Sequence, residues 1–95
     1  MQPMPVADSI KRKLNAGLAP ARLTVTDQSH LHAGHAGARP GGETHFLVEI
    51  VSASFRGMTR LARQREVHRL LAAELSGPVH ALSIAARTPE EAGDG

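Results

Sequence analysis

The feature that most restricts the fold of this chain is a segment with apolar residues at helical spacing, which lies between two segments whose apolar and polar residues alternate. Residues 44–52 and 79–86 alternate between two faces, as half-buried strands do, and the second run places His80 on the same face as Leu82 and Ile84. Residues 59–75, between them, repeat apolar side chains every three or four positions, as a packed helix does. Because a strand that follows a helical crossover lies parallel to a neighbour, the sequence predicts a parallel strand pair covered by a helix.

Two further elements are expected before this unit. Ile10, Leu14 and Leu18 share one face of a first helix, which ends near Pro20, and residues 23–27 alternate as a short strand. The order is therefore helix, strand, strand, helix, strand. An α+β domain follows, with a three-stranded sheet, helices on one face and the other face open.

The 95 residues suffice for one domain, which we expect to span residues 1–88. Residues 89–95 are acidic and contain glycine, so we expect a disordered tail. No apolar run approaches the roughly 20 residues of a membrane span, and the N-terminus lacks the pattern of a secretory signal. The absence of cysteine excludes a disulfide framework, a thiol nucleophile and a thiolate-only cluster site in this chain alone. We therefore expect a cytoplasmic protein without a membrane partner.

Four of the six histidines fall within residues 29–46, and three of them, His30, His32 and His35, lie in a glycine-rich stretch with no apolar period. Long stretches of this kind are often functional. Three explanations are open: a metal site, a pH-dependent or nucleic-acid-binding surface, and ordinary solvated polarity. The spacing of the three histidines matches no established zinc signature.

Four arginines crowd the expected second helix: Arg60, Arg63, Arg65 and Arg69. We expect Arg60, Arg63 and Arg69 on its solvated faces, where the group forms a surface for a protein partner or for nucleic-acid phosphates. A Gly-x-x-Gly phosphate clamp is absent, since the preceding turn holds only Gly57. No Ser-His-Asp set, phosphate-cradling loop or paired carboxylates are visible, so the sequence indicates a protein that is not an enzyme.

Several motifs together resemble the BolA family. They are ETHFLVEIVSASFRGMTRLARQREVH at residues 43–68, ELSGPVHALSIAARTPEE at residues 74–91, and LTVTDQSHLHAGH at residues 23–35. The resemblance covers about residues 6–91. It implies an αββαβ core of the class II KH-like type, which agrees with the order of elements that periodicity predicts.

The resemblance also implies a function. Members of this family pair with monothiol glutaredoxins and share a glutathione-supported [2Fe-2S] cluster in iron-sulfur cluster maturation, trafficking or iron sensing. Other members are described as stress- and morphology-linked transcriptional regulators, which makes DNA binding through the arginine-rich helix the alternative. The chain alone is then a monomer without a cofactor, and a heterodimer with its partner.

Candidate cluster ligands follow from the family motifs. The histidine of Val-His-Ala-Leu falls on His80, the loop ligand falls on His35, and His45 of Thr-His-Phe is a third candidate. The family's helix histidine is replaced here by Gln64. Neutral imidazole is the available borderline donor in a chain without cysteine, so the partner must supply the thiolates.

Overall fold

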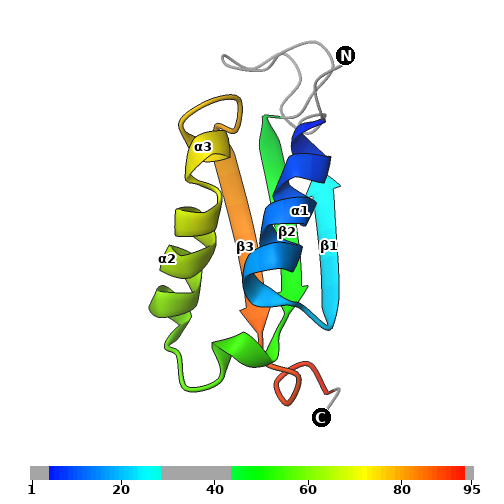
Figure 1. The fold of residues 1–95 in the computed structure, drawn as a ribbon, viewed down its shortest axis with the longest axis vertical. Helices are drawn as coiled ribbons and strands as arrows, with labels where there is room; N and C mark the ends of the chain where they lie inside the picture. The colour runs from blue at the N-terminus through cyan, green and yellow to red at the C-terminus, as the bar shows by residue number, and fades with distance from the viewer. Residues whose placement is uncertain (1–4, 29–43, 94–95) are drawn as a thin grey trace.

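The computed structural model describes residues 5–28 and 44–93 of the chain, and Figure 1 shows the arrangement of the elements. In chain order these are α1 (Val6–Leu18), β1 (Arg22–Asp27), β2 (His45–Val51), the 3-10 turn η2 (Ala53–Phe55), α2 (Arg60–Leu70), α3 (Ala72–Leu75) and β3 (Ala81–Arg87). The order αββαβ that the sequence predicts is confirmed. The second helix, expected as one piece over residues 59–75, is instead divided in two.

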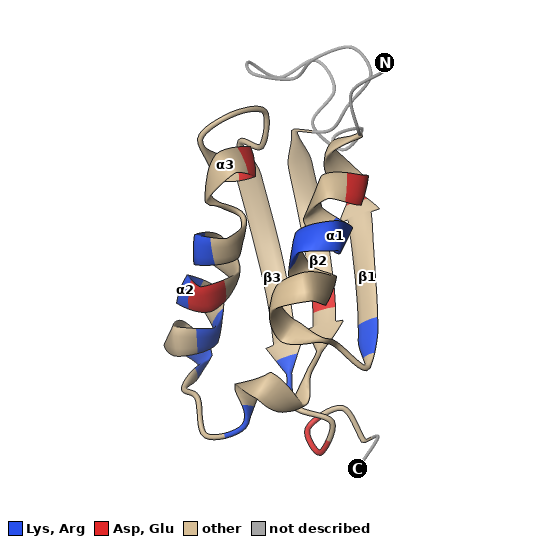
Figure 2. Cartoon of the chain, viewed as in Figure 1, with Lys and Arg blue, Asp and Glu red and all other residues tan. Residues whose placement is uncertain are grey.

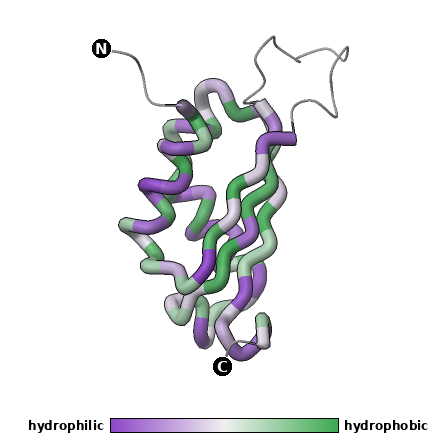
Figure 3. The backbone as a smooth tube through the Cα atoms, turned by 90° about the vertical axis from the view of Figure 1, so that its right-hand side faces the viewer, coloured by the Kyte–Doolittle hydropathy of each residue, from purple (hydrophilic) through white to green (hydrophobic). Residues whose placement is uncertain are grey.

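The three strands form one mixed sheet in the order β1-β2-β3. β1 and β2 are antiparallel, with Asp27 opposite Phe46, and β2 and β3 are parallel, with Phe46 opposite Leu82. The helices cover one face of this sheet (Figures 1 and 3). The predicted α+β domain with a parallel strand pair is therefore confirmed.

The hydrophobic core lies between the sheet and the helices. Phe46, Val48 and Ile50 face it from the central strand β2, each at most 1% exposed. The helices, η2 and the segment before β3 bury a further set against them: Ile10, Leu14, Leu18, Phe55, Val67, Leu71 and Val79. The alternation of hydrophobic and hydrophilic positions along the strands is visible in Figure 3. The half-buried strand predicted over residues 44–52 and the apolar face predicted for the first helix are confirmed.

α1 and α2 pack closely at a glycine. A Cβ atom at Gly17 would lie 2.8 Å from both terminal carbons of Leu70, so a larger residue would force that side chain to move. α1 ends directly afterwards, where Ala19 takes left-handed backbone angles (φ 42°, ψ 56°) and Pro20 follows. The predicted end of the first helix is confirmed.

The break in the second helix lies at Leu71, whose backbone angles (φ −104°, ψ 20°) leave the helical range. On α3, Glu74 is 7% exposed and accepts hydrogen bonds from Ser9 Oγ at 2.6 Å and Lys13 Nζ at 3.0 Å on α1. Burial opposes ionisation of this carboxyl, but the bonds from Lys13 and Ser9 outweigh burial and leave its pKa below the ordinary value. α3 is thereby tied to α1 by a charged contact.

Hydroxyl groups cap the turns between β2 and α2. Ser52 is fully buried; its Oγ donates to the Leu18 carbonyl at 2.6 Å and accepts from Ser54 N–H at 3.1 Å. Gly57 adopts a positive φ of 78°, which a residue with a Cβ adopts only with strain. Thr59 then caps α2 by accepting from Ala62 N–H at 3.0 Å.

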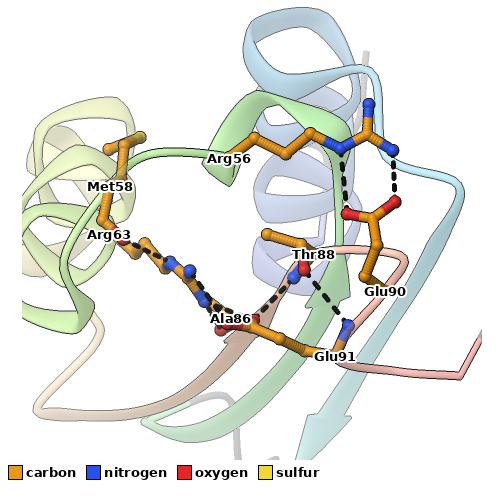
Figure 4. A network of polar contacts seen from close by, with 7 residues as sticks. All are labelled: Arg56, Met58, Arg63, Ala86, Thr88, Glu90 and Glu91. Atoms are coloured by element: carbon orange, nitrogen blue, oxygen red, sulfur yellow. Dashed lines mark hydrogen bonds and ion pairs between the residues drawn. The ribbon is translucent and has the colours of Figure 1, made fainter. Parts of the chain in front are cut away.

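Residues 89–93, part of the segment that the sequence predicts to be disordered, form turns beyond the end of β3, where Glu90 and Glu91 pair with Arg56 and Arg63 (Figure 4). Thr88 and Glu91 form a reciprocal capping pair: Thr88 N–H donates to the Glu91 carboxylate at 2.9 Å, and Glu91 N–H donates to Thr88 Oγ1 at 3.2 Å. Glu90 pairs with Arg56. These contacts give the acidic residues fixed partners.

Candidate functional site

Two of the predicted ligands, His45 and His80, lie side by side at one end of the sheet. His45 opens β2 and His80 directly precedes β3, and the two strands are parallel, so both histidines come to the same end. Their ring centroids are 6.2 Å apart, with the ring planes inclined by 72°. The two imidazoles are therefore neighbours in an edge-to-face arrangement at this end of the sheet.

Both rings can be reached from outside the core. His80 is exposed and His45 is half-buried, whereas the neighbouring Val79 is 3% exposed and packs in the core. His80 lies one residue before β3 and is exposed, whereas Leu82 and Ile84, predicted to share its face, are half-buried. The ring at position 80 is therefore free of the packed interior.

Thr44 joins the two histidines. It is 0% exposed, and its Oγ1 lies 2.9 Å from His45 Nδ1. Its carbonyl accepts from His80 N–H at 2.7 Å and from Ala81 N–H at 3.2 Å. One buried residue therefore contacts the ring of one histidine and holds the backbone of the other.

The predicted loop ligand, His35, lies outside the described residues, as do His30 and His32. The segment that carries them joins Gln28 to Thr44, and Gln28 N–H donates to the His45 carbonyl at 2.7 Å. Both ends of the segment therefore adjoin His45. Among residues 5–28 and 44–93 no group of three or more His, Asp or Glu side chains could hold a metal ion, so the described pair needs a further donor.

The prediction that Arg63 lies on a solvated face is wrong, because this residue is 6% exposed. Its Nε donates to the Met58 carbonyl and its Nη1 to the Ala86 carbonyl, both at 3.1 Å, and its two terminal nitrogens bind the Glu91 carboxylate at 2.6 and 3.1 Å (Figure 4). The guanidinium and the Thr88 N–H lower the pKa of Glu91 to about 2. Arg63 therefore ties α2 to β3 and to the C-terminal turns.

The other arginines of α2 remain at the surface (Figure 2). Arg60, Arg65 and Arg69 are exposed, and Arg69 pairs with Glu66 at 2.7 Å. Gln64, at the position of the family's helix histidine, donates from Nε2 to the Ile84 carbonyl at 3.1 Å. Gln64 and Arg63 therefore bind carbonyl groups of β3, an edge strand of the sheet. A cavity of about 510 Å³ lies beside them, between α2 and this strand.

Residue patterns carried signals for two features that we did not predict. Arg63 lies four residues before Val67, so helical spacing places it on the buried stripe, although its charge favours the surface. Thr88-Pro89-Glu90-Glu91 has the spacing of a capping box with proline at the first helical position. No local pattern marks the contact of Thr44 with both histidines.

No helix in the described part of the chain is long and apolar enough to span a lipid bilayer.

Comparisons with known proteins agree over most of the chain. A family model described as BolA-like protein matches residues 14–91. BolA-like protein 1 of Homo sapiens is 49% identical over 87 residues, which cover 92% of this chain and 61% of that protein. The match spans about three fifths of the length of such curated relatives.

Two solved structures from Arabidopsis thaliana are similar along nearly their whole length. The BolA domain of SufE1 has a TM-score of 0.83 and 42% identity, with 95% of this chain and 99% of that chain covered. BolA1 has a TM-score of 0.82 and 40% identity, with 94% and 98% covered.

Proposed function

The chain belongs to the BolA-like protein family, and on this premise we propose that it is a non-enzymatic adaptor that binds a monothiol glutaredoxin and shares a [2Fe-2S] cluster with it. The observation that carries the proposal is the pair of accessible imidazoles, His45 and His80, at one end of the sheet. The roles of the two rings as ligands come from the family resemblance.

The donor set of this chain suits such an arrangement. A chain without cysteine offers imidazole nitrogen, which suits iron, and leaves the thiolates to the glutaredoxin and to glutathione. Two imidazoles among the described residues fall short of a complete site, so the proposal requires further donors, which it assigns to the partner and to the segment outside the described residues. Histidine ligation in place of thiolate raises the reduction potential of a [2Fe-2S] centre.

We assign the main ligand role to His80, whose backbone is held by the bond from its N–H to the Thr44 carbonyl. His35 is the second ligand that the resemblance implies, and His45 is the third candidate. A backbone held by the sheet keeps the first imidazole in place while the segment before residue 44 brings the second. The adaptor would serve cluster maturation, trafficking or iron sensing, in the cytoplasm and as a heterodimer with its partner.

A matched pair of histidine variants tests the proposal. We expect His80→Ala to lose the visible circular dichroism change that the wild-type chain produces with a cluster-loaded monothiol glutaredoxin and glutathione. His68→Ala is the control, since His68 is an exposed residue of α2 without an assigned role. Equal spectra and equal affinity for wild type and His80→Ala would contradict the ligand assignment.

DNA binding is the second candidate function, favoured by the exposed arginines of α2. Arg60 and Arg65 are the residues to test, because Arg63 serves the fold and Arg69 is paired with Glu66. Affinity for a DNA duplex should fall with salt, and the double variant Arg60→Ala/Arg65→Ala should reduce the salt slope by about 2. An unchanged slope would remove this surface.

A further inference from the structure

We infer that Arg63 and Gln64 close the outer edge of β3 against pairing with the β3 strand of a second copy of this chain. β3 is an edge strand, because the order of the sheet is β1-β2-β3. Edge strands present unpaired N–H and C=O groups that recruit further strands, and native proteins block such edges with charged side chains or covering segments. This role of the two side chains is independent of the proposed cluster function.

The hydrogen bonds of the sheet show which groups of β3 face outward. The Arg87 carbonyl accepts from Ser52 N–H at 2.9 Å, so Arg87 turns its carbonyl toward the chain that continues β2. Along a strand the backbone polar groups alternate between two sides, and the N–H and C=O of one residue share a side. Ala86 and Ile84, one and three residues earlier, therefore turn both groups toward the free edge.

Two neighbouring side chains of α2 occupy the outward carbonyls. Gln64 Nε2 donates to the Ile84 carbonyl and Arg63 Nη1 donates to the Ala86 carbonyl, both at 3.1 Å (Figure 4 shows the second contact). Glu91 helps to hold the guanidinium over the edge, since its carboxylate lies 2.6 Å from the same Nη1. A strand that approached from outside would have to displace both side chains, and Arg63, which is 6% exposed, would lose buried partners.

Side chains, and not the backbone of α2, close this part of the edge. A cavity of about 510 Å³ lies between α2 and β3 at these residues, and it is lined by side chains of the helix and by residues 84–87 of the strand. The helix backbone therefore stands away from the edge. Removal of the two side chains would enlarge this space and expose the carbonyls.

The sequence of β3 favours a second copy of the chain as the strand that would pair there. Residues 81–86 carry no charge, and only the last residue of the strand, Arg87, is charged. In a two-fold antiparallel pair centred on Ile84, Leu82 would lie opposite Ala86 of the second copy, so apolar side chains would meet and no like charges would face each other. Such a pair would join the two sheets into one.

The test opens the edge with the double variant Arg63→Ala/Gln64→Ala and follows association by sedimentation velocity over a range of protein concentrations. We expect this variant to form dimers at concentrations at which the wild-type chain is a monomer. Hydrogen exchange of the Ile84 and Ala86 N–H groups should slow about 10-fold or more in the dimer, because these groups become paired.

Two other variants keep the test decisive. Gln64→Ala alone leaves Arg63 in place and opens only the Ile84 carbonyl, so it should fold even where the double variant does not, and it should dimerise more weakly. Arg65→Ala/His68→Ala is the matched control, because it removes one arginine and one neutral residue from the exposed part of α2, and it should stay monomeric.

A proline identifies the surface that associates. Ala86→Pro, added to the double variant, should abolish the dimer, because proline removes an outward N–H that the sheet does not use. Dimers that persist with this proline, or that leave exchange at Ile84 and Ala86 unchanged, would overturn the inference, since another surface would then be responsible. Edge variants that are as monomeric as wild type at every concentration would overturn it as well.

Discussion

We expect Arg63→Ala to lower the free energy of unfolding by about 3 kcal/mol, a large share of the roughly 5–15 kcal/mol typical of a domain. The substitution removes a guanidinium that is 6% exposed and joins α2 and the turn before it to Ala86 and Glu91, 23 and 28 residues further along the chain (Figure 4). Arg63 is the residue of α2 whose predicted and observed environments differ most, since its charge favours a solvated face.

The magnitude follows from the partners that the variant would leave behind. The carbonyls of Met58 and Ala86 lose a charged donor, at about 1 kcal/mol each, below the usual 1.5–3 kcal/mol because the adjacent hollow admits water. The pair with Glu91 adds about 0.5 kcal/mol, since that carboxylate is 45% exposed and solvent screens it. The Phe55 ring, 5.9 Å from the guanidinium carbon, adds about as much.

Urea denaturation followed by far-ultraviolet circular dichroism at neutral pH measures the loss. Arg65→Ala is the matched control, an exposed arginine on the same helix, and should change stability by no more than about 0.5 kcal/mol. A loss below about 1 kcal/mol for Arg63→Ala, or one equal to that of the control, would refute the structural role of Arg63. The charge of Arg63 would then again be a candidate for binding DNA or a protein partner.

Three further perturbations test the fold. In the folded state the pKa of Glu91 is about 2 and that of Glu74 is also below the ordinary 4.5, so the two carboxylates contribute fully to the free energy of unfolding above pH 4.5, and this contribution is lost as the pH falls toward 2. Glu91→Gln should make the loss of stability with falling pH shallower in urea titrations. A pH dependence identical to that of wild type would contradict the pairing of Glu91. Gly57→Ala should lower the free energy of unfolding by about 1 kcal/mol in a thermal unfolding assay, because alanine at a positive φ strains the backbone. A Cβ there meets no atom within 4 Å, so no steric clash adds to this loss, and an unchanged stability would argue against the positive φ. Phe46→Ala should lower the free energy of unfolding by about 3–5 kcal/mol in the same assay, because Phe46 is 1% exposed and its removal leaves a cavity in the core. A smaller loss would mean that neighbouring side chains relax into the cavity.

Local periodicity sufficed for much of the fold. The alternation over residues 44–52 predicted a half-buried strand, on which Phe46, Val48 and Ile50 are the buried residues, and the helix between two strand runs predicted the parallel pair. That pairing brings His45 and His80 together, because parallel strands begin at the same end of a sheet.

Features that depend on partners distant in the chain could not be predicted from the sequence. Burial of Arg63 requires acceptors from β3 and from the C-terminal turn, and a charged residue gives no local sign that such acceptors are present. The helix break at Leu71 accompanies a charged contact between Glu74 and α1, 61 residues away in the chain at Lys13. The Thr44 carbonyl likewise accepts from His80 N–H only because β3 lies beside β2 in the folded sheet. The assignment of His35 as the loop ligand stays a prediction.

Nitrogen hyperfine couplings show whether an imidazole of this chain binds the iron of a shared cluster. The chain would carry nitrogen-15 histidine, and pulsed electron paramagnetic resonance would be recorded on the reduced cluster in its complex with a monothiol glutaredoxin. We expect strong nitrogen-15 couplings in the wild-type complex that disappear or diminish in His80→Ala. Couplings that are absent from the wild-type complex, or that are unchanged in the variant, would contradict it.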